Sequence, residues 1–255
     1  MLALAPRCVR ESPDEVGVDD GLQAEHDPRY RGWLFKNRTH VRRMGRKTKL
    51  ENNMSKPLKA QDSALILIDH QIISMSMIKT QSPEIAKHNN IALVKAAKIL
   101  GIPNVWTSST EDANKDWWMP GLEEINPDAY ARRIKRTGII DSWNDPDFVR
   151  AVEATGRHSL IMAGTTNDGC LLYTALNARR AGYEVHAVLD AGGSPFQISE
   201  DAARLRMMQG GIVLTATNTL MGELADDWAL PHGQQIRLVL AETFQHTLGS
   251  FGLST

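Results

Sequence analysis

Cys170 carries a thiol at a place in the sequence that favours covalent chemistry. The apolar run SLIMAG (159–164) predicts a buried strand, a short polar loop follows, and a helical pattern over 169–182 begins beside the cysteine. At the start of a helix, the dipole lowers the pKa of a thiol, and free backbone N–H groups can bind an oxyanion. Such a thiol is suited to acyl transfer through a thioester. The alternative is a cysteine that acts only as a small buried hydrophobe.

Asp69 is the second candidate, because it ends the hydrophobic run ALILID (64–69). A partly desolvated carboxylate there could take the thiol proton and later return it to a leaving group. Its alternative role is that of a turn or helix-capping residue. Lys135 and Arg136 lie on a weak strand over 133–138, where alternating side chains bring only one of them to a given face. Either cation could hold the carboxylate and the sulfur together.

The elements that must position these groups alternate between short apolar runs and longer amphipathic ones. Six runs are predicted to be strands: 64–69, 104–109, 133–138, 159–164, 184–190 and 212–217. Five segments between and after them are predicted to be helices: 83–101, 145–156, 169–182, 199–211 and 219–229. The order predicts an open, doubly wound α/β fold of the Rossmann type, a three-layer α/β/α sandwich around a mostly parallel six-stranded sheet.

Ligands of such sheets bind at the carboxyl ends of the strands. This rule directs attention to the residues that follow the predicted strands: Asp69, 108–110, Arg136, 164–170 and Asp190. The sequence has no GxGxxG, GxxxxGK[ST], HExxH or CxxC motif, so we expect neither a cofactor nor a metal.

Composition places the chain among globular proteins, with 255 residues, 42% hydrophobic and 23% charged, and a net charge of -1. Residues 1–53 carry 11 basic and 8 acidic side chains, and residues 54–255 carry 18 and 22. The stretch 29–49 has nine basic side chains and no acidic one. We expect 1–53 to be a disordered extension, with at most weak nucleic-acid binding through 29–49, and 54–255 to be the catalytic domain. A start of translation near Met54 is the alternative.

Cysteine usage and hydropathy predict a cytoplasmic protein without a membrane partner. Cys8 and Cys170 lie in different parts of the sequence, so a disulfide framework is not expected and a reducing compartment is. No window approaches the roughly 18 apolar residues of a spanning helix. The apolar stretch within the first eleven residues is too short for a secretory signal.

Three blocks of the sequence resemble the isochorismatase-like cysteine hydrolases, and most closely their YcaC-related branch. The blocks are ALILIDHQ (64–71), NPDAYARRIKRTGIIDSWNDPDFVRAVEATGR (126–157) and LIMAGTTNDGCLLYTALNARRAGYEVHAVLDAGG (160–193). The resemblance implies the α/β fold above and a triad of Asp69, Arg136 and Cys170, with Arg where the wider family has Lys. If the register slips by one residue, Lys135 is the cation. An arginine would act by electrostatic positioning, because it does not readily give up a proton.

The resemblance also implies a loop geometry around the cysteine. A cis peptide bond is expected between Thr165 and Thr166, and the oxyanion hole would be formed by the N–H groups of Thr166 and Cys170. The substrate pocket implied by the resemblance and the loop sequences is lined by four residues: Gln71, Trp117, Thr165 and Asn167.

Departures from the family narrow the expected activity. The segment 105–121 contains no His, which disfavours a metal-dependent nicotinamidase, and Cys170 disfavours an isochorismatase that cleaves a vinyl ether. We therefore expect a hydrolase of an amide-like or related C–N bond in a small molecule, or alternatively a binding, scaffold or redox-active protein that retains the fold. Trp117 and Trp118 would form a pocket wall or an intersubunit contact. The resemblance implies a homo-oligomer, such as an octamer.

Overall fold

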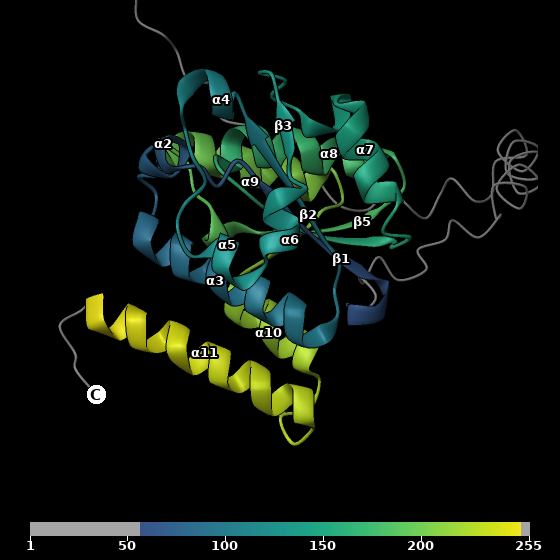
Figure 1. Cartoon of the computed structure of the whole chain (residues 1–255), viewed down its shortest axis with the longest axis vertical. Coiled ribbons are helices and arrows are strands. Elements are labelled where there is room, and N and C mark those ends of the chain that lie inside the picture. The colour runs from purple at the N-terminus through teal and green to yellow at the C-terminus, as the bar shows by residue number, and fades with distance from the viewer. Residues whose placement is uncertain (1–56, 251–255) are drawn as a thin grey trace, which may run out of the picture. The chain divides into compact units, whose positions relative to one another are not determined.

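The computed structural model of the chain describes the backbone of residues 57–250 and the side chains of residues 57–245 (Figure 1). The expectations for 1–53, with Cys8, the basic stretch 29–49 and a start at Met54, lie outside the described residues.

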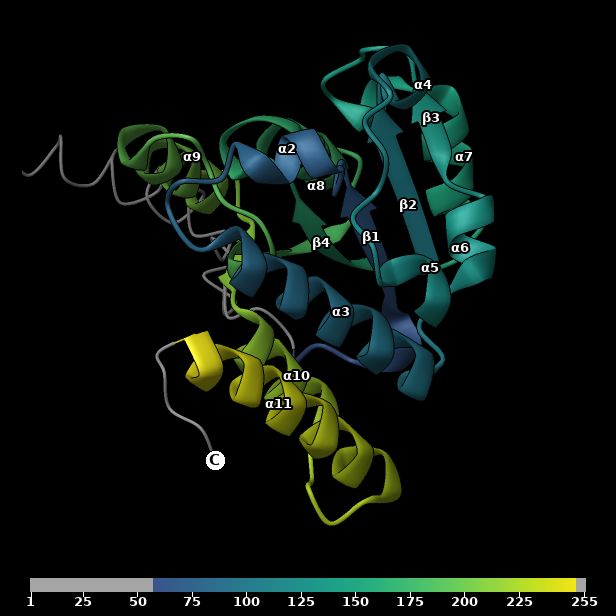
Figure 2. The same ribbon diagram turned by 60° about the vertical axis from the view of Figure 1, so that its left-hand side comes forward.

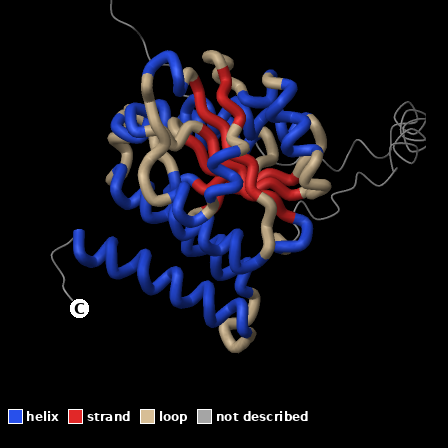
Figure 3. Tube along the Cα trace, viewed as in Figure 1, coloured by secondary structure: helices blue, strands red, loops and turns tan. Residues whose placement is uncertain are grey.

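The described part of the chain is built around a six-stranded sheet, drawn in red in Figure 3. The strands are β1 (Ser63–Ile68), β2 (Asn104–Ser109), β3 (Ile134–Arg136), β4 (Ser159–Gly164), β5 (Glu184–Val188) and β6 (Val213–Thr215). Their order is β3-β2-β1-β4-β5-β6, and every neighbouring pair is parallel. The order reverses direction between β1 and β4. This confirms the predicted fold class and places the topological switch point, where doubly wound sheets bind ligands, between those two strands.

β1 shows why the sheet is covered on both faces. All six of its residues are buried, and successive side chains enter different cores. Leu65 and Leu67 pack in one cluster, and Ile66 and Ile68 in another. A strand that is apolar on both faces is typical of parallel sheets sandwiched between helices.

The helices form the outer layers (Figure 2). One face is covered by α3 (Pro83–Leu100) and α10 (Thr217–Ala225), whose apolar side chains share the cluster of Leu65. The other face is covered by α7 (Pro146–Glu153), α8 (Leu172–Arg180) and α9 (Gln197–Gln209). Ser82 caps the start of α3, where its hydroxyl accepts from the N–H of Ile85 at 3.4 Å, and Gly101 caps the end in the left-handed conformation.

The structure shortens several predicted elements and adds others. The weak strand over 133–138 is reduced to three residues in β3, and the helix predicted over 169–182 begins only at Leu172, after a turn over Asn167–Leu171. The helix expected to start at Ser199 starts at Gln197. The described residues form five further α-helices that were not predicted: α2 (Ile72–Ser76), α4 (Glu111–Asn114), α5 (Leu122–Ile125), α6 (Pro127–Ala131) and α11 (Pro231–Ser250).

α11 is the largest addition. Its residues Ile236, Val239 and Leu240 pack against α3 and α10, so it forms a further layer outside the sandwich. Within the described residues, no helix has both the length and the apolar character needed to cross a membrane.

Candidate active site

Asp69 stands directly after β1, on one side of the switch point. Its backbone turns into the left-handed region with φ of 58°, and its N–H donates to the carbonyl of Thr107 at 2.9 Å. The side chain is almost wholly buried. Oδ1 of the carboxylate accepts from the guanidinium of Arg136, whereas no described residue satisfies Oδ2 by a hydrogen bond. Oδ2 is therefore the oxygen left to receive a proton.

Arg136, at the end of β3, is fixed on several sides. Its Nε donates to Oγ1 of Thr107 at 2.9 Å, and Nη1 donates to the carbonyls of Ile139 and Ile140. The remaining contact is its buried ion pair with Asp69. A guanidinium held by this many acceptors is a rigid charge rather than a mobile one.

Lys135 points elsewhere, as the alternation of side chains along a strand requires. Its Nζ pairs with Asp112 at 2.8 Å and lies 3.5 Å from Glu111, and its side chain is 40% exposed. Of the two cations left open by the sequence, the structure brings Arg136, and not Lys135, to Asp69.

Cys170 lies across the switch point, in the turn Asn167–Leu171 between β4 and α8. Burial raises the pKa of its thiol, and the charge of Asp69 raises the pKa further; Arg136 and the N–H of Thr166 act in the opposite direction without cancelling the effect. The prediction of a lowered pKa was wrong. It counted the helix dipole, but it included neither the burial of the sulfur nor the carboxylate beside it.

The carboxylate has the complementary property. Burial raises the pKa of Asp69 above its ordinary value, while the ion pair with Arg136 and the neighbouring Cys170 thiol lower it in part. A thiol that keeps its proton thus faces a carboxylate that is more basic than an exposed one. Such a pair can pass a proton from sulfur to oxygen when the sulfur acts as a nucleophile.

The loop before the cysteine has the expected cis peptide bond between Thr165 and Thr166. Thr165 is anchored by its N–H, which donates to the carbonyl of Ile68 at 3.0 Å, and by its hydroxyl, which lies 3.4 Å from the sulfur of Met75. The N–H of Thr166 faces the sulfur of Cys170.

The side chains predicted to line a pocket differ in their surroundings. Gln71 is fully buried: its amide nitrogen donates to the carbonyls of Ser109 at 3.1 Å and Asp116 at 2.8 Å, and its oxygen accepts from the N–H of Ser109 at 2.8 Å. Thr165 and Asn167 are also enclosed by protein. These three side chains are therefore placed to hold the loops together.

Trp117 is the exposed member of the predicted set, with half of its surface accessible. Its neighbour Trp118 is buried and stacks on Trp106, with ring centroids 5.1 Å apart. The carbonyl of Trp117 accepts from the N–H of Ile72 at 2.9 Å, and both Ile72 and Ile73 are about half exposed. Exposed apolar side chains are therefore carried by Trp117 and by the segment that pairs with its backbone.

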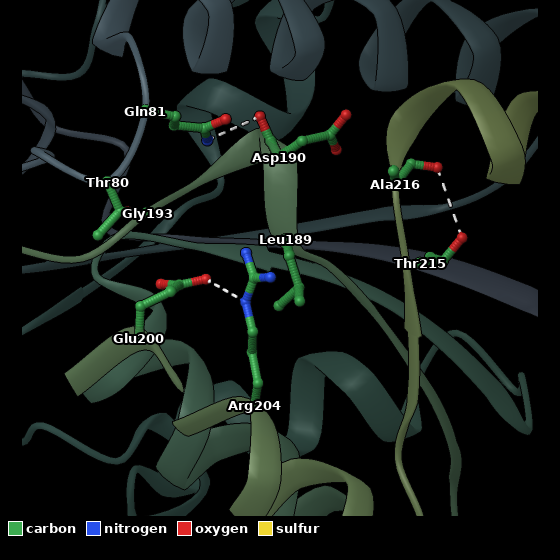
Figure 4. Close-up of a pocket in the computed structure, with 9 residues that line it drawn as sticks. All are labelled: Thr80, Gln81, Leu189, Asp190, Gly193, Glu200, Arg204, Thr215 and Ala216. Carbon is green, nitrogen blue, oxygen red and sulfur yellow. Dashed lines mark hydrogen bonds and ion pairs between the residues drawn. The ribbon is translucent and has the colours of Figure 1, made fainter. Parts of the chain in front are cut away.

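A cavity of about 220 Å³ lies near the carboxyl ends of β5 and β6 (Figure 4). Its polar lining includes Asp190, Glu200 and Arg204, and it contains none of the three proposed catalytic residues. Asp190 accepts from the N–H of Thr217 at 2.8 Å and from its hydroxyl at 2.9 Å, so it caps the start of α10.

Thr107 is a site residue that the sequence analysis missed. It accepts from Arg136 and donates to the carbonyl of Ile134 at 2.9 Å, whereas the sequence had directed attention to the hydroxyls of 108–110. The hydroxyl of Ser108 instead donates to Glu111 at 2.6 Å. The signal was the hydroxyl of Thr107 in the run VWTSS, which alternation places on the side of the strand opposite to Ser108.

The side chains of 57–245 include no group of three or more His, Cys, Asp or Glu residues that could hold a metal ion.

The chain is similar in sequence to proteins that contain an isochorismatase domain. The family model for the isochorismatase domain matches residues 63–219. The probable hydrolase YcaC of Escherichia coli is 35% identical over 178 residues, which cover 69% of this chain and 85% of that protein. Isochorismatase domain-containing protein 2B of Mus musculus is 33% identical over 151 residues, covering 59% of this chain and 68% of that protein.

Two solved structures are similar over most of their length. YcaC from Pseudomonas aeruginosa, solved with hexane-2,5-diol and covalent acrylamide, is 33% identical with a TM-score of 0.70, covering 78% of this chain and 99% of that one. YcaC from Escherichia coli, an octameric hydrolase of unknown specificity, is 34% identical with a TM-score of 0.68, covering 77% of this chain and 95% of that one.

Proposed function

The chain belongs to the isochorismatase-domain family, and from this premise we propose that it is a cysteine hydrolase that cleaves an amide-like C–N bond of a small molecule through a thioester. One observation carries the proposal. A buried carboxylate, Asp69, is paired with Arg136 through one oxygen only, next to a thiol, Cys170, that keeps its proton at rest.

The first half of the reaction forms the thioester. As the sulfur of Cys170 attacks the carbonyl carbon, the thiol proton passes to Oδ2 of Asp69. The carbonyl oxygen becomes an oxyanion that accepts from the N–H groups of Thr166 and Cys170. When the C–N bond breaks, Asp69 returns the proton to the leaving nitrogen, and the acyl group stays on sulfur.

The second half releases the acid. Asp69 takes a proton from water, the resulting hydroxide attacks the thioester carbonyl, and the C–S bond breaks. The sulfur regains its proton from Asp69 as the carboxylic acid leaves. Arg136 stays charged throughout, holding the carboxylate in place without giving up a proton.

The pocket is part of the same proposal. Trp117, which is exposed, would provide an aromatic wall against the substrate. Gln71, Thr165 and Asn167 would shape the pocket through the loops that they hold, because their side chains are enclosed.

The test is capture of the acyl group or of an electrophile on the nucleophile. The full chain is incubated with a panel of small amides and with acrylamide, and adducts are located by intact mass and peptide mapping. We expect an adduct on Cys170 that is absent from Cys170→Ser and retained in Cys8→Ser. Amide cleavage at an unchanged rate in Cys170→Ser would contradict the proposal. Acrylamide is included because the structure of the Pseudomonas aeruginosa relative holds it covalently.

The sequence left two alternatives, a redox role and a binding or scaffold role. A redox role needs a thiol that ionises readily, and the raised pKa of Cys170 argues against it. A binding or scaffold protein on the same fold would give no adduct and no turnover in the experiment above.

We also propose that the protein forms a homo-oligomer in the cytoplasm, where a nucleophilic thiol stays reduced. The Escherichia coli relative is octameric, and the apolar surface of Ile72, Ile73 and Trp117 suits burial between subunits. Light scattering measures the oligomeric state directly; a monomer at micromolar concentration would contradict this proposal.

A further inference from the structure

We propose that Glu200 is a positioning residue for the oxyanion loop: its buried carboxylate, through Asn167, fixes the segment 165–167 that carries the N–H of Thr166. The proposal rests on the proposed cysteine hydrolase and adds to it a residue that lies outside the triad.

Glu200 lies in the first turn of α9 and has 1% of its surface exposed. Its carboxylate accepts three hydrogen bonds. Oε1 accepts from Nδ2 of Asn167 at 3.1 Å and from Nε of Arg204 at 2.9 Å, and Oε2 accepts from the hydroxyl of Ser194 at 2.6 Å. Figure 4 shows the pair formed with Arg204 at the wall of the cavity.

Asn167 transmits this constraint to the loop. Its side-chain amide also donates to the carbonyl of Leu189 at 3.0 Å, and its backbone N–H donates to the carbonyl of Gly193 at 2.9 Å. Thr165, two residues earlier, forms a bridge with the same Gly193. Thr166 is therefore held between two residues that are both tied to one neighbouring segment, and this fixes the direction of its N–H.

Close packing against Gly192 restricts the orientation of the side-chain amide of Asn167. A Cβ at this position would meet both the carbonyl of Gly164 and Oδ1 of Asn167, so the glycine allows the two segments to approach. Oδ1 itself is buried and accepts no hydrogen bond from a described residue. The orientation of Asn167 is consequently set by what its Nδ2 can reach, which is Leu189 and Glu200.

The ion pair with Arg204, whose side chain is 47% exposed, offsets the cost of burying the carboxylate of Glu200. The pKa of the Cys170 thiol is set mainly by its burial and by Asp69, and the N–H of Thr166 has the smallest of the named effects. Loss of Glu200 should therefore disturb oxyanion binding much more than the reactivity of the sulfur itself.

Two reagents separate these effects. p-Nitrophenyl acetate acylates a thiol through an oxyanion and releases p-nitrophenolate, whereas iodoacetamide alkylates it by displacement of iodide and forms no oxyanion. We expect Glu200→Gln to lower the acylation rate at least about tenfold and to change the alkylation rate by less than about twofold. Asp201→Asn is the matched control, because Asp201 is the next residue on α9, carries the same charge and is exposed. It should leave both rates unchanged, and Asp69→Asn should slow both.

A Glu200→Gln variant that acylates at the wild-type rate, or that loses both rates equally, overturns the positioning role. If the wild type shows no acylation, the proposed hydrolase is in doubt, and hydrogen exchange still tests Glu200. We expect amides of 165–171 to exchange at least about tenfold faster in Glu200→Gln than in Asp201→Asn, and equal exchange would overturn the inference. If Glu200→Gln does not fold, Asn167→Asp, whose carboxylate cannot donate to Glu200, tests the contact from the other side and is judged by the same measurements.

Discussion

At the scale of single residues, Arg136 is the least replaceable cation of the site. Its guanidinium binds Asp69 and Thr107 and also the carbonyls of Ile139 and Ile140. A lysine ammonium is a point charge on a flexible stem and cannot reproduce this fork of donors. The wider family's lysine is thus not interchangeable with this arginine within the surroundings that β2 and β3 provide.

We therefore predict that Arg136→Lys lowers the rate of Cys170 acylation by about 10- to 100-fold, and that Arg136→Gln lowers it further because the carboxylate of Asp69 loses its counter-charge. Lys135→Gln, which removes the neighbouring exposed cation, should stay within about twofold of the wild type. The measurement is the p-nitrophenolate burst in the first turnover. An Arg136→Lys variant with wild-type acylation would show that only the charge matters.

The sequence was most informative here about residue identity and least informative about electrostatics. Asp69 and Cys170 follow strands that can be recognised from their apolar runs, so their meeting at one sheet edge was predictable. The direction of the thiol pKa was not, since it depends on how deeply the sulfur is buried and on which carboxylate faces it. The cis bond between Thr165 and Thr166 was predictable only by family resemblance.

At the scale of elements, Gln71 joins the end of β2 to the loop that precedes Trp117. Its three hydrogen bonds all reach backbone groups, of Ser109 and Asp116. The contact with Asp116 is buried and the two with Ser109 are partly buried, and each buried group left unsatisfied costs about 1–3 kcal/mol. From its sequence context, Gln71 was predicted to line the substrate pocket. A residue that joins two loops and a residue that contacts substrate respond differently to substitution.

We predict that Gln71→Leu lowers the free energy of unfolding by about 2–4 kcal/mol, measured by urea titration. Gln197→Leu, which changes an exposed glutamine on α9, should change it by less than about 0.5 kcal/mol. If Gln71 instead contacts substrate, the variant would retain its stability and show a raised KM, which would contradict the joining role.

Element boundaries failed where tertiary contacts, rather than local pattern, determine them. β3 contains only three residues because it pairs with β2 alone, over the stretch from Ile134 to Arg136. α11 was missed although the spacing of Ile236, Val239 and Leu240 is helical. The last predicted strand ends at residue 217, so the alternation of strands and helices that guided the prediction ended before this helix.

At the scale of the whole molecule, the switch point explains why one carboxylate and one thiol far apart in sequence form a pair. His70, the residue next to Asp69, makes the stability of the fold depend on pH. His70 is fully enclosed, its Nε2 lies 3.0 Å from the carbonyl of Ala191, and Nδ1 has no hydrogen-bond partner among the described residues. Burial lowers the pKa of His70 to about 4, from 6.5 for a free histidine, and the carbonyl of Ala191 opposes this only in part.

The folded protein therefore excludes a proton that the unfolded chain binds. The stability contributed by neutral His70 is fully present above about pH 6.5 and is lost as the pH falls toward about 4, since unfolding takes up a proton in that interval. Between pH 7 and pH 5 this one residue should lower the free energy of unfolding by about 2 kcal/mol.

Urea titrations at the two pH values measure this loss of stability. His70→Gln, which cannot be protonated, should reduce the difference by about that amount, whereas His158→Gln, at an exposed position, should leave it unchanged. An equal loss of stability in wild type and His70→Gln would assign the acid sensitivity to other groups, first among them His186, whose pKa burial also lowers.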